Sequence, residues 1–497
     1  MSQVSRRIFL KGAAAMPLAL WVARYANAAD PVVRYDIASP NGAAMMEIYA
    51  NSVQQMQAMG PDNPLSWMWQ WYTHFVDGTT TKANEIARIF GTTVTPTSSL
   101  ATEMWNTCQS HSGQNANNFL PWHRMFLFFF ENIVRQVSGH PEFAVPYWNY
   151  VSADPALRGV LPLQFRLKDD ATYSVLYRPN RTLLANSGQP IQKNQAADPM
   201  DISTAMAKTA YSTVGAVQGF CRAIDSGIHG AIHVLVGNKT NMGAVPYAAR
   251  DPLFWVHHSS IDRMWVSWNA NGGVNPSTVA WARQPFVFAD PQGQRVSSRL
   301  LDYFSTEPLG YTYDALIPPA VSPATTLAAT ATTATRSTGT KPQSVAKAQT
   351  AAELGSRPVH ARLVPLAGAP TTTVLGLNPA QPQKHAYLVL KDLHTWKQPE
   401  VLYDVYLTPV TGGRLGRESH VGSINFFDAE FHDHGNGAMA EALGENFYSF
   451  DVTRLLQGIA RSGNPNARYG LLVTFVPGGT PTAGAKPLVA TIELVIQ

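Results

Sequence analysis

The chain has 497 residues, 45% hydrophobic and 14% charged, so it can bury a large core and form two to four domains. Its 37 lysines and arginines outnumber its 33 acidic residues, but four of these basic residues lie within the first 28 positions. Subtracting those four leaves 33 residues of each sign, which gives no electrostatic case for binding nucleic acid or an anionic membrane. Two cysteines in so long a chain exclude a fold held together by disulfides.

Residues 1–28 have the pattern of a twin-arginine export signal. Ser5–Lys11 contains two consecutive arginines, Gly12–Val22 is apolar, and Ala26–Ala28 is a small-x-small cleavage site. We therefore expect a mature chain that begins near Ala29 and lies in the periplasm or outside the cell. No other uninterrupted apolar run approaches the ~20 residues of a membrane span, so the mature protein is predicted to be soluble.

The region 29–317 is rich in tryptophan and phenylalanine, has several helical patterns and contains two groups of three histidines. These histidines are His74, His111 and His123, followed by His229, His233 and His258. Imidazole is a ligand that suits copper, zinc, iron and nickel, whereas magnesium and calcium prefer oxygen. Di-iron sites in helical bundles are built largely from glutamates. Two three-histidine groups without obvious carboxylates therefore predict a pair of copper ions.

The second histidine group has the more informative spacing. His229 and His233 are four residues apart, which places them on one face of a helix. Asp251 and Pro252 are typical of a helix start, and the helix that they open would carry His258 and Asp262 on one face.

Composition changes after residue 317. Residues 318–358 are rich in alanine, threonine, serine and proline and lack large apolar groups, which is typical of a linker. Residues 359–497 show alternating strand patterns broken by turn residues, which predicts a separate β-sandwich-like domain. Cys108 and Cys221 could pair in an oxidising compartment.

Two longer motifs carry a resemblance to a known family. Asp251–Asp262 (DPLFWVHHSSID) resembles the second-copper signature of the type-3 copper proteins, which include tyrosinases, catechol oxidases and haemocyanins. Phe119–Glu131 (FLPWHRMFLFFFE) is similar to the family's first-copper signature. Tyr311–Tyr313 resembles its tyrosine motif, so the resemblance spans about Arg34 to Tyr313. The strand-rich tail is more loosely similar to the C-terminal shielding domain of larger polyphenol oxidases.

The resemblance implies a mainly α-helical core, a four-helix bundle, with two copper ions and O2 as co-substrate. The first copper would be bound by His74, His111 and His123, and the second by His229, His233 and His258. His257 matches a family position that does not bind copper and is expected to be a satisfied buried histidine, while His140 is expected in a loop. The shielding domain can cover the copper pocket, and Phe426–Gly435 is the segment that could reach it. Its own histidines are candidate metal ligands, although a polar turn between strands fits them better.

Several positions depart from the family pattern. The loop after His111 is longer than usual, and Cys108 lies three residues before that histidine. A thioether between cysteine and histidine, as in plant and fungal members, competes here with a buried thiol. Asp225 is the nearest candidate for the acidic residue that orders a water, and it could equally be a turn residue or helix cap. Gly230 stands where efficient hydroxylases often have asparagine, and Val245 stands where a phenylalanine can cover the first copper.

Three functions compete at this stage. A tyrosinase, which hydroxylates monophenols and oxidises o-diphenols to o-quinones, is favoured by Val245 and by the export signal. A catechol oxidase without the first activity is favoured by Gly230. A haemocyanin-like oxygen carrier is disfavoured because the chain has one copper unit and an export signal, and ortho-aminophenol oxidation is a minor alternative. The sequence leaves open the preferred phenol, the oligomeric state, a copper chaperone, and whether the product is melanin or a detoxified plant phenol.

Overall fold

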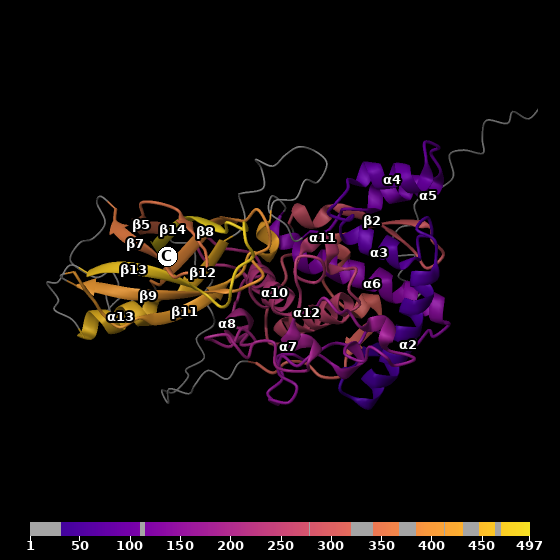
Figure 1. The fold of residues 1–497 in the computed structure, drawn as a ribbon, viewed down its shortest axis with the longest axis horizontal. Coiled ribbons are helices and arrows are strands. Elements are labelled where there is room, and N and C mark those ends of the chain that lie inside the picture. The colour runs from indigo at the N-terminus through magenta and orange to yellow at the C-terminus, as the bar shows by residue number, and fades with distance from the viewer. Residues whose placement is uncertain are drawn as a thin grey trace, which may run out of the picture.

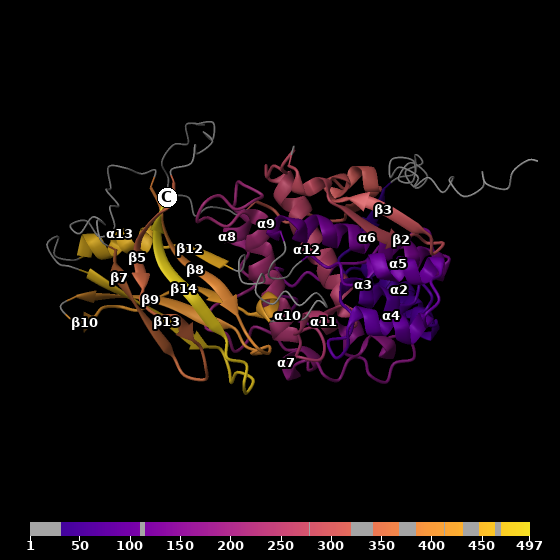
Figure 2. The ribbon, with the colours of Figure 1, turned by 90° about the horizontal axis from the view of Figure 1, so that it is seen from above.

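The computed structural model describes residues 31–109, 115–277, 279–319, 341–366, 384–411, 413–430, 447–462 and 469–497. Residues 31–319 form a helical region, and the described residues from 341 onward form a lobe of strands beside it (Figures 1 and 2). The export signal, His111, the histidines of the loop after Glu430 and residues 320–340 of the predicted linker lie outside the described residues.

The helical region contains helices of very different lengths. They are α2 (Pro40–Ala58), α3 (Trp67–His74), α4 (Lys82–Phe90), α5 (Pro96–Met104), α6 (Phe119–Ser138), α7 (Leu183–Asn186), α8 (Ser203–Met206), α9 (Phe220–Ala223), α10 (Gly230–Val236), α11 (Val245–Ala248) and α12 (Leu253–Ala270). Short strands accompany them: β1 (Val32–Arg34), β2 (Pro285–Ala289), β3 (Arg295–Arg299) and β4 (Tyr311–Tyr313). A six-residue π-type turn, η4 (Ile224–His229), connects α9 to α10.

Helices α6 and α12 form the centre of this region. Both are buried along nearly their whole length, and the polar residues that they carry, such as Arg124, Glu131 and Asp262, are buried with them. Helix α6 ends at Gly139, whose φ of 72° suits glycine. Helix α12 begins just after Asp251, whose carboxylate accepts a hydrogen bond from the Leu253 N–H at 2.9 Å and is itself held by buried Arg181. The Asp-Pro prediction of a helix start is therefore confirmed.

Aromatic side chains join four of these helices. The rings of Phe130 on α6 and Trp255 on α12 stack at 3.5 Å between centroids. Trp67 on α3 meets both of these rings edge-on, at 6.1 and 6.2 Å. Tyr49 on α2 packs against Phe130 and donates a hydrogen bond to the Pro252 carbonyl. Such close packing fixes the mutual orientation of the helices that carry the histidines.

The start and end of the helical region are joined by a strand pair and a buried charge cluster. Strand β1 pairs in parallel with β4, so that Arg34 lies opposite Tyr313. The Arg34 guanidinium contacts Glu131 on α6 and Asp262 on α12, at 3.0 and 2.9 Å. The hydroxyls of Tyr311 and Tyr313 both donate to the Asp262 carboxylate. The tyrosine motif thus locks β4 onto the two central helices.

The C-terminal region is built from strands and one helix. Its elements are β5 (Gln343–Ala348), β6 (Ala352–Glu353), β7 (Val359–Pro365), β8 (Ala386–His394), β9 (Tyr403–Thr411), β10 (Arg414–Leu415), β11 (Ser419–Ile424), β12 (Phe447–Asp451), α13 (Thr453–Ser462), β13 (Tyr469–Pro477) and β14 (Leu488–Ile496). The prediction of a β-rich C-terminal region is confirmed. The predicted start of the strand-rich region at residue 359 is wrong. Strands β5 and β6 lie within the predicted linker, where small apolar residues of the alanine-rich segment pair with β14.

The strands form one curled sheet instead of the two facing sheets of a sandwich. Among the described residues, hydrogen bonding follows the order β10-β9-β13-β7-β5-β14-β8-β12, with β11 beside β9. The Tyr448 hydroxyl on β12 nevertheless accepts a hydrogen bond, at 3.0 Å, from the N–H of Asn425, just after β11. Phe450 of β12 also covers Gly422 of β11, leaving no room there for a Cβ. The two ends of the strand order therefore meet, and the sheet closes on itself.

The two regions share a buried contact. Leu402 and Phe427 belong to the C-terminal region but pack into the hydrophobic core of the helical region. The short segment that contains Phe427 lies beside α10, where the two lobes meet in Figure 1. Within the described part of the chain, none of the helices combines the length and apolarity needed to cross a membrane.

Candidate metal centre

Five of the six predicted histidines converge in the interior of the helical region. His74 is the last residue of α3, His123 lies on α6 and His258 lies on α12. His229 ends the η4 turn and His233 lies one helical turn later on α10. All five side chains are buried. The sixth histidine, His111, lies outside the described residues.

The two groups meet face to face. The His123 and His258 rings stack at 4.4 Å with an interplanar angle of 9°, which links the first group to the second. The His229 and His233 rings are 4.6 Å apart, and the His229 and His258 rings are 5.2 Å apart. The His74 and His123 rings are 6.0 Å apart. Helices distant in sequence therefore bring the predicted ligands together.

Most of the five rings are held by a hydrogen bond on one side. The Nδ1 atoms of His123 and His233 lie 2.8 and 2.6 Å from the carbonyl oxygens of Phe119 and Met242. His229 Nδ1 lies 3.1 Å from a carboxylate oxygen of Asp225, and His74 is bonded to the backbone of Val245. A histidine anchored through one ring nitrogen presents the other nitrogen in a fixed direction, as metal-binding histidines generally do.

Burial favours the neutral form of four of these imidazoles. Desolvation lowers the pKa of His123 to about 3 and the pKa values of His74, His233 and His258 well below the ordinary value, and neighbouring histidines add to the effect. A neutral imidazole has the lone pair that a metal ion needs.

The donor set fits transition metals bound by nitrogen. Among the described residues, no hydrogen-bond partner reaches His233 Nε2 or either ring nitrogen of His258, although all three atoms are buried. Buried polar atoms without partners are costly, and a bound cation would satisfy them. Imidazole nitrogens without carboxylate ligands favour copper over the oxygen-preferring ions.

His257 differs from its expected role. It is buried, as predicted, but neither of its ring nitrogens has a hydrogen-bond partner among the described residues. Its ring lies 5.0 Å from His233 and 5.5 Å from His229, so a fourth imidazole borders the second group. The prediction of a satisfied histidine is wrong, because the surrounding groups at this end of α12 are rings and apolar side chains. His140, in contrast, lies in an exposed loop as expected.

Cys108 lies within the first group. Its Sγ atom is 3.5 Å from His123 Nε2, and His74, Cys108 and His123 are close enough to share a metal ion. Neither of the two described cysteines forms a disulfide, so the predicted Cys108–Cys221 alternative is not adopted. Because His111 lies outside the described residues, the thioether alternative stays a prediction.

Asp225 is a buried side chain and not a solvated turn residue. Its carboxylate contacts His229 Nδ1 on one oxygen and the Arg222 guanidinium, at 3.0 Å, on the other. Burial alone would raise the pKa of Asp225, but the hydrogen bond to His229 and the charge of Arg222 outweigh it and the pKa is lowered. Asp428, from the C-terminal region, lies close enough to group with Asp225 and His229. Asp225 thus fixes the orientation of the His229 ring.

The C-terminal region covers the second histidine group. The Phe427 ring stacks on His233 at 4.0 Å with an interplanar angle of 8°, and meets His229 edge-on at 5.6 Å. The Asn425 side chain occupies the space in which a Cβ at Gly230 would lie. Val245, the other position expected to tune access, is buried at the start of α11. The sequence marked Phe426–Gly435 as a segment that could reach the site, but gave no signal for Asn425 or Tyr448.

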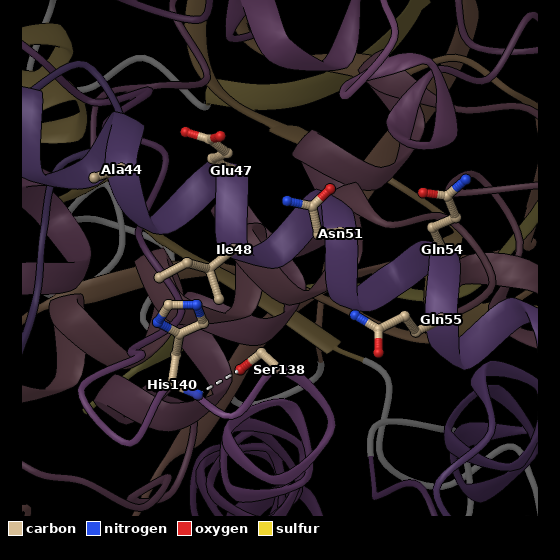
Figure 3. A pocket seen from close by; sticks show the side chains of 8 residues that line it. All are labelled: Ala44, Glu47, Ile48, Asn51, Gln54, Gln55, Ser138 and His140. Atoms are coloured by element: carbon tan, nitrogen blue, oxygen red, sulfur yellow. Dashed lines mark hydrogen bonds between the residues drawn. The ribbon is translucent and has the colours of Figure 1, made fainter.

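A separate surface pocket is lined by none of the five converging histidines. It is lined by residues of α2 and by the turn after α6, as Figure 3 shows, and includes Glu47, Asn51 and His140. The His140 N–H donates to Ser138, and its ring pairs with Glu142. None of the predicted ligands lines this pocket.

A family model described as the common central domain of tyrosinase matches residues 64–195 and 168–271. The chain is 30% identical over 293 residues to the tyrosinase HcTyr1 of Hahella sp. (strain CCB-MM4), an alignment that covers 54% of this chain and 60% of the relative. It is 29% identical over 230 residues to polyphenol oxidase II, chloroplastic, of Ipomoea batatas, covering 39% of this chain and 38% of that protein. The chain thus spans less than two thirds of these relatives.

The fold is similar to that of solved structures over both the helical and the C-terminal regions. Latent apple tyrosinase superposes with a TM-score of 0.59 at 20% identity, covering 94% of this chain and 97% of that chain. A functional unit of octopus hemocyanin gives a TM-score of 0.51 at 16% identity, covering 93% and 99%. At these identities the likeness shows a shared fold.

Proposed function

We propose that this chain is a member of the type-3 copper protein family and a copper-dependent oxidoreductase of small phenols. The observation that carries the proposal is the convergence of five buried histidines from α3, α6, η4, α10 and α12. In this proposal α3, α6, α10 and α12 are the four-helix bundle that the resemblance implies. O2 is the second substrate.

The proposed ligands divide between two copper ions. His74 and His123, with His111, would hold the first ion, and His229, His233 and His258 would hold the second. When bound, the copper pair supplies the two-electron chemistry that couples reduction of O2 to oxidation of a phenol. The protein contributes orientation, because Asp225 and the backbone carbonyls of Phe119 and Met242 fix ring directions. Its buried aromatic walls exclude water.

The activity we propose is that of a tyrosinase: ortho-hydroxylation of monophenols and oxidation of o-diphenols to o-quinones. Support comes from the tyrosinase among its relatives and from the small Val245. A catechol oxidase is the second candidate, and the observation that favours it is Gly230. Export through the twin-arginine pathway is proposed from the sequence alone.

Oxygen uptake by the purified, copper-loaded full chain tests the proposal. We expect consumption with both a monophenol such as tyrosine and a catechol, and its loss in His258→Ala, which removes a proposed ligand of the second ion. Two copper ions per chain should accompany the activity. Uptake with catechol alone would transfer the assignment to catechol oxidase, and reversible O2 binding without phenol turnover would favour a carrier.

Asp225→Asn distinguishes two roles for this carboxylate. If Asp225 orients His229, as their 3.1 Å contact supports, monophenol and catechol turnover should fall together, by about 10- to 100-fold. If it holds a water that removes the phenol proton, monophenol turnover should fall well before catechol turnover. Steady-state rates on both substrates separate these outcomes. Asp201 is exposed, so Asp201→Asn is a control that should match the wild type.

A further inference from the structure

The turn that carries His229 has an irregular backbone. Residues Ile224–His229 form a π-type turn, and Gly227 within it has φ −85° and ψ −107°, outside the helical region. Both Asp225 and His229 belong to this turn. A break in the helical hydrogen-bond pattern needs support from its surroundings, and π-turns occur often at functional sites.

That support comes from the C-terminal region. The Ser226 carbonyl, just before the irregular Gly227, accepts a hydrogen bond from Asn425 Nδ2 at 2.7 Å and another from the Tyr448 hydroxyl at 2.9 Å. The Ser226 hydroxyl accepts from Gln218 Nε2 at 3.0 Å, and the same Gln218 amide donates to the Phe447 carbonyl. All of these bonds lie in the buried or partly buried boundary between the two regions. Two donors separated from Ser226 by about half the chain thus meet one carbonyl.

Gly230 makes this contact possible. A Cβ at position 230 would overlap the Asn425 side-chain amide, so only glycine leaves space for it. The Asn425 Oδ1 atom accepts from the Phe427 N–H at 3.1 Å, which connects the supporting contact to the segment that covers His233. Covering the site and supporting the turn are therefore performed by different side chains of one segment.

We infer that Asn425 and Tyr448 are positioning residues of the second metal site: they hold the turn Ile224–His229, and through it Asp225 and His229, in the metal-binding arrangement. On this inference the C-terminal region completes the site as well as covering it. The inference rests on the proposed function only in taking His229 as a metal ligand. It follows that opening the cover at Phe427 and loosening the turn are separable changes.

The test uses full-length Tyr448→Phe, Asn425→Ala and the double variant. Tyr448→Phe removes one hydroxyl and keeps the ring, so the C-terminal sheet should retain its packing. In the metal-free protein, we expect amide exchange across residues 224–230 to become about tenfold faster in the double variant, since local opening governs exchange. In the copper-loaded double variant, we expect a chelator to remove one of the two copper ions at a concentration about 10- to 100-fold lower than in the wild type. The other ion should be retained, which leaves a half-loaded centre with the paramagnetic resonance signal of a single Cu(II).

Gly230 and Gln497 provide matched controls. Gly230→Ala should reproduce the Asn425→Ala phenotype by displacing the amide, and combining the two changes should add little to either. Gln497 also bridges the regions, accepting from the Ala216 N–H and donating to the Val214 carbonyl, but it does not touch the turn. Gln497→Ala should therefore leave exchange at 224–230 and copper retention as in the wild type.

Unchanged exchange and copper retention in the double variant would overturn the inference, as would equal loss of both ions. Equal effects of Gln497→Ala and the double variant would also overturn it, since general undocking would explain both. Failure of the proposed function looks different. A wild-type protein that binds no copper or oxidises no phenol would contradict that function, while exchange in the metal-free variants would still decide whether the turn is supported from the C-terminal region.

Discussion

Phe427→Ala should raise the catechol turnover of the full-length, copper-loaded protein by about tenfold or more. The Phe427 ring is buried against His233 and packs into the helical core, where it occupies the space next to the second histidine group. Truncating a buried phenylalanine forfeits about 3 kcal/mol or more, and every 1.4 kcal/mol changes a population ratio tenfold. If the covered state excludes phenols, the uncovered fraction and the apparent affinity for catechol increase together. Oxygen uptake at subsaturating catechol measures this change.

The control is Trp396→Ala, which truncates a large aromatic that is 55% exposed on the same region and should leave turnover unchanged. Cleavage of the predicted linker with dissociation of the whole cover should not reproduce this gain, because Asn425 and Tyr448 would then leave the turn that carries His229. Turnover in Phe427→Ala that equals the wild type, with two coppers still bound, would mean that the ring does not limit access.

Asp262→Asn should destabilise the helical region by about 3–5 kcal/mol, because it leaves the buried Arg124 charge without its carboxylate partner and removes one of the two partners of Arg34. The carboxylate lies in contact with Arg34 and Arg124 and accepts hydrogen bonds from Tyr311 and Tyr313, all of them buried. Burial would raise the pKa of Asp262, but the charges of Arg124 and Arg34 outweigh it, and the pKa is lowered. A lowered folded-state pKa means that this stabilisation is complete above the unfolded value of ~3.9 and declines as the pH falls below it.

Chemical denaturation of the metal-free protein at pH 7 and at pH 3 measures both parts of this prediction. The difference between wild type and Asp262→Asn should be large at pH 7 and smaller at pH 3. Asp302→Asn is the matched control, since its pair with Arg299 is partly exposed and such pairs contribute about 0–1 kcal/mol. A shift no larger than that of the control would show that the cluster does not hold the helices together.

The sequence predicted those parts of the site in which spacing and chemistry coincide. His229 and His233 lie one helical turn apart, Asp251 caps the helix of His258, and the Tyr311–Tyr313 motif meets Asp262. Each of these follows from a local pattern or a specific motif. The gathering of the histidines could be expected because imidazole is a ligand for copper and the two long motifs resemble copper signatures.

Other features depend on contacts between distant segments. The π-turn at Gly227 and the use of Gly230 as a space for Asn425 appear only when the C-terminal region is in place. The curled sheet closes through Tyr448 and Asn425, whereas strand patterns alone fit a sandwich equally well. The linker boundary was placed too late because β5 uses small residues that resemble linker composition. The prediction for His257 was wrong because the hydrogen bonding of its ring nitrogens depends on neighbouring side chains that no motif specifies.

The pairing of β1 with β4 sets the earliest point at which the two ends of the helical region can join. Arg34 bonds to a tyrosine that is 279 residues later in the chain, and the same cluster joins the two central helices. Contacts of such long sequence separation form late, because closing the long loop costs conformational entropy before the contact contributes any favourable free energy. During synthesis the amino-terminal strand must therefore wait until residue 313 has left the ribosome. The apolar surfaces of α6 and α12 are exposed during that interval, and this is when the chain is most prone to aggregate.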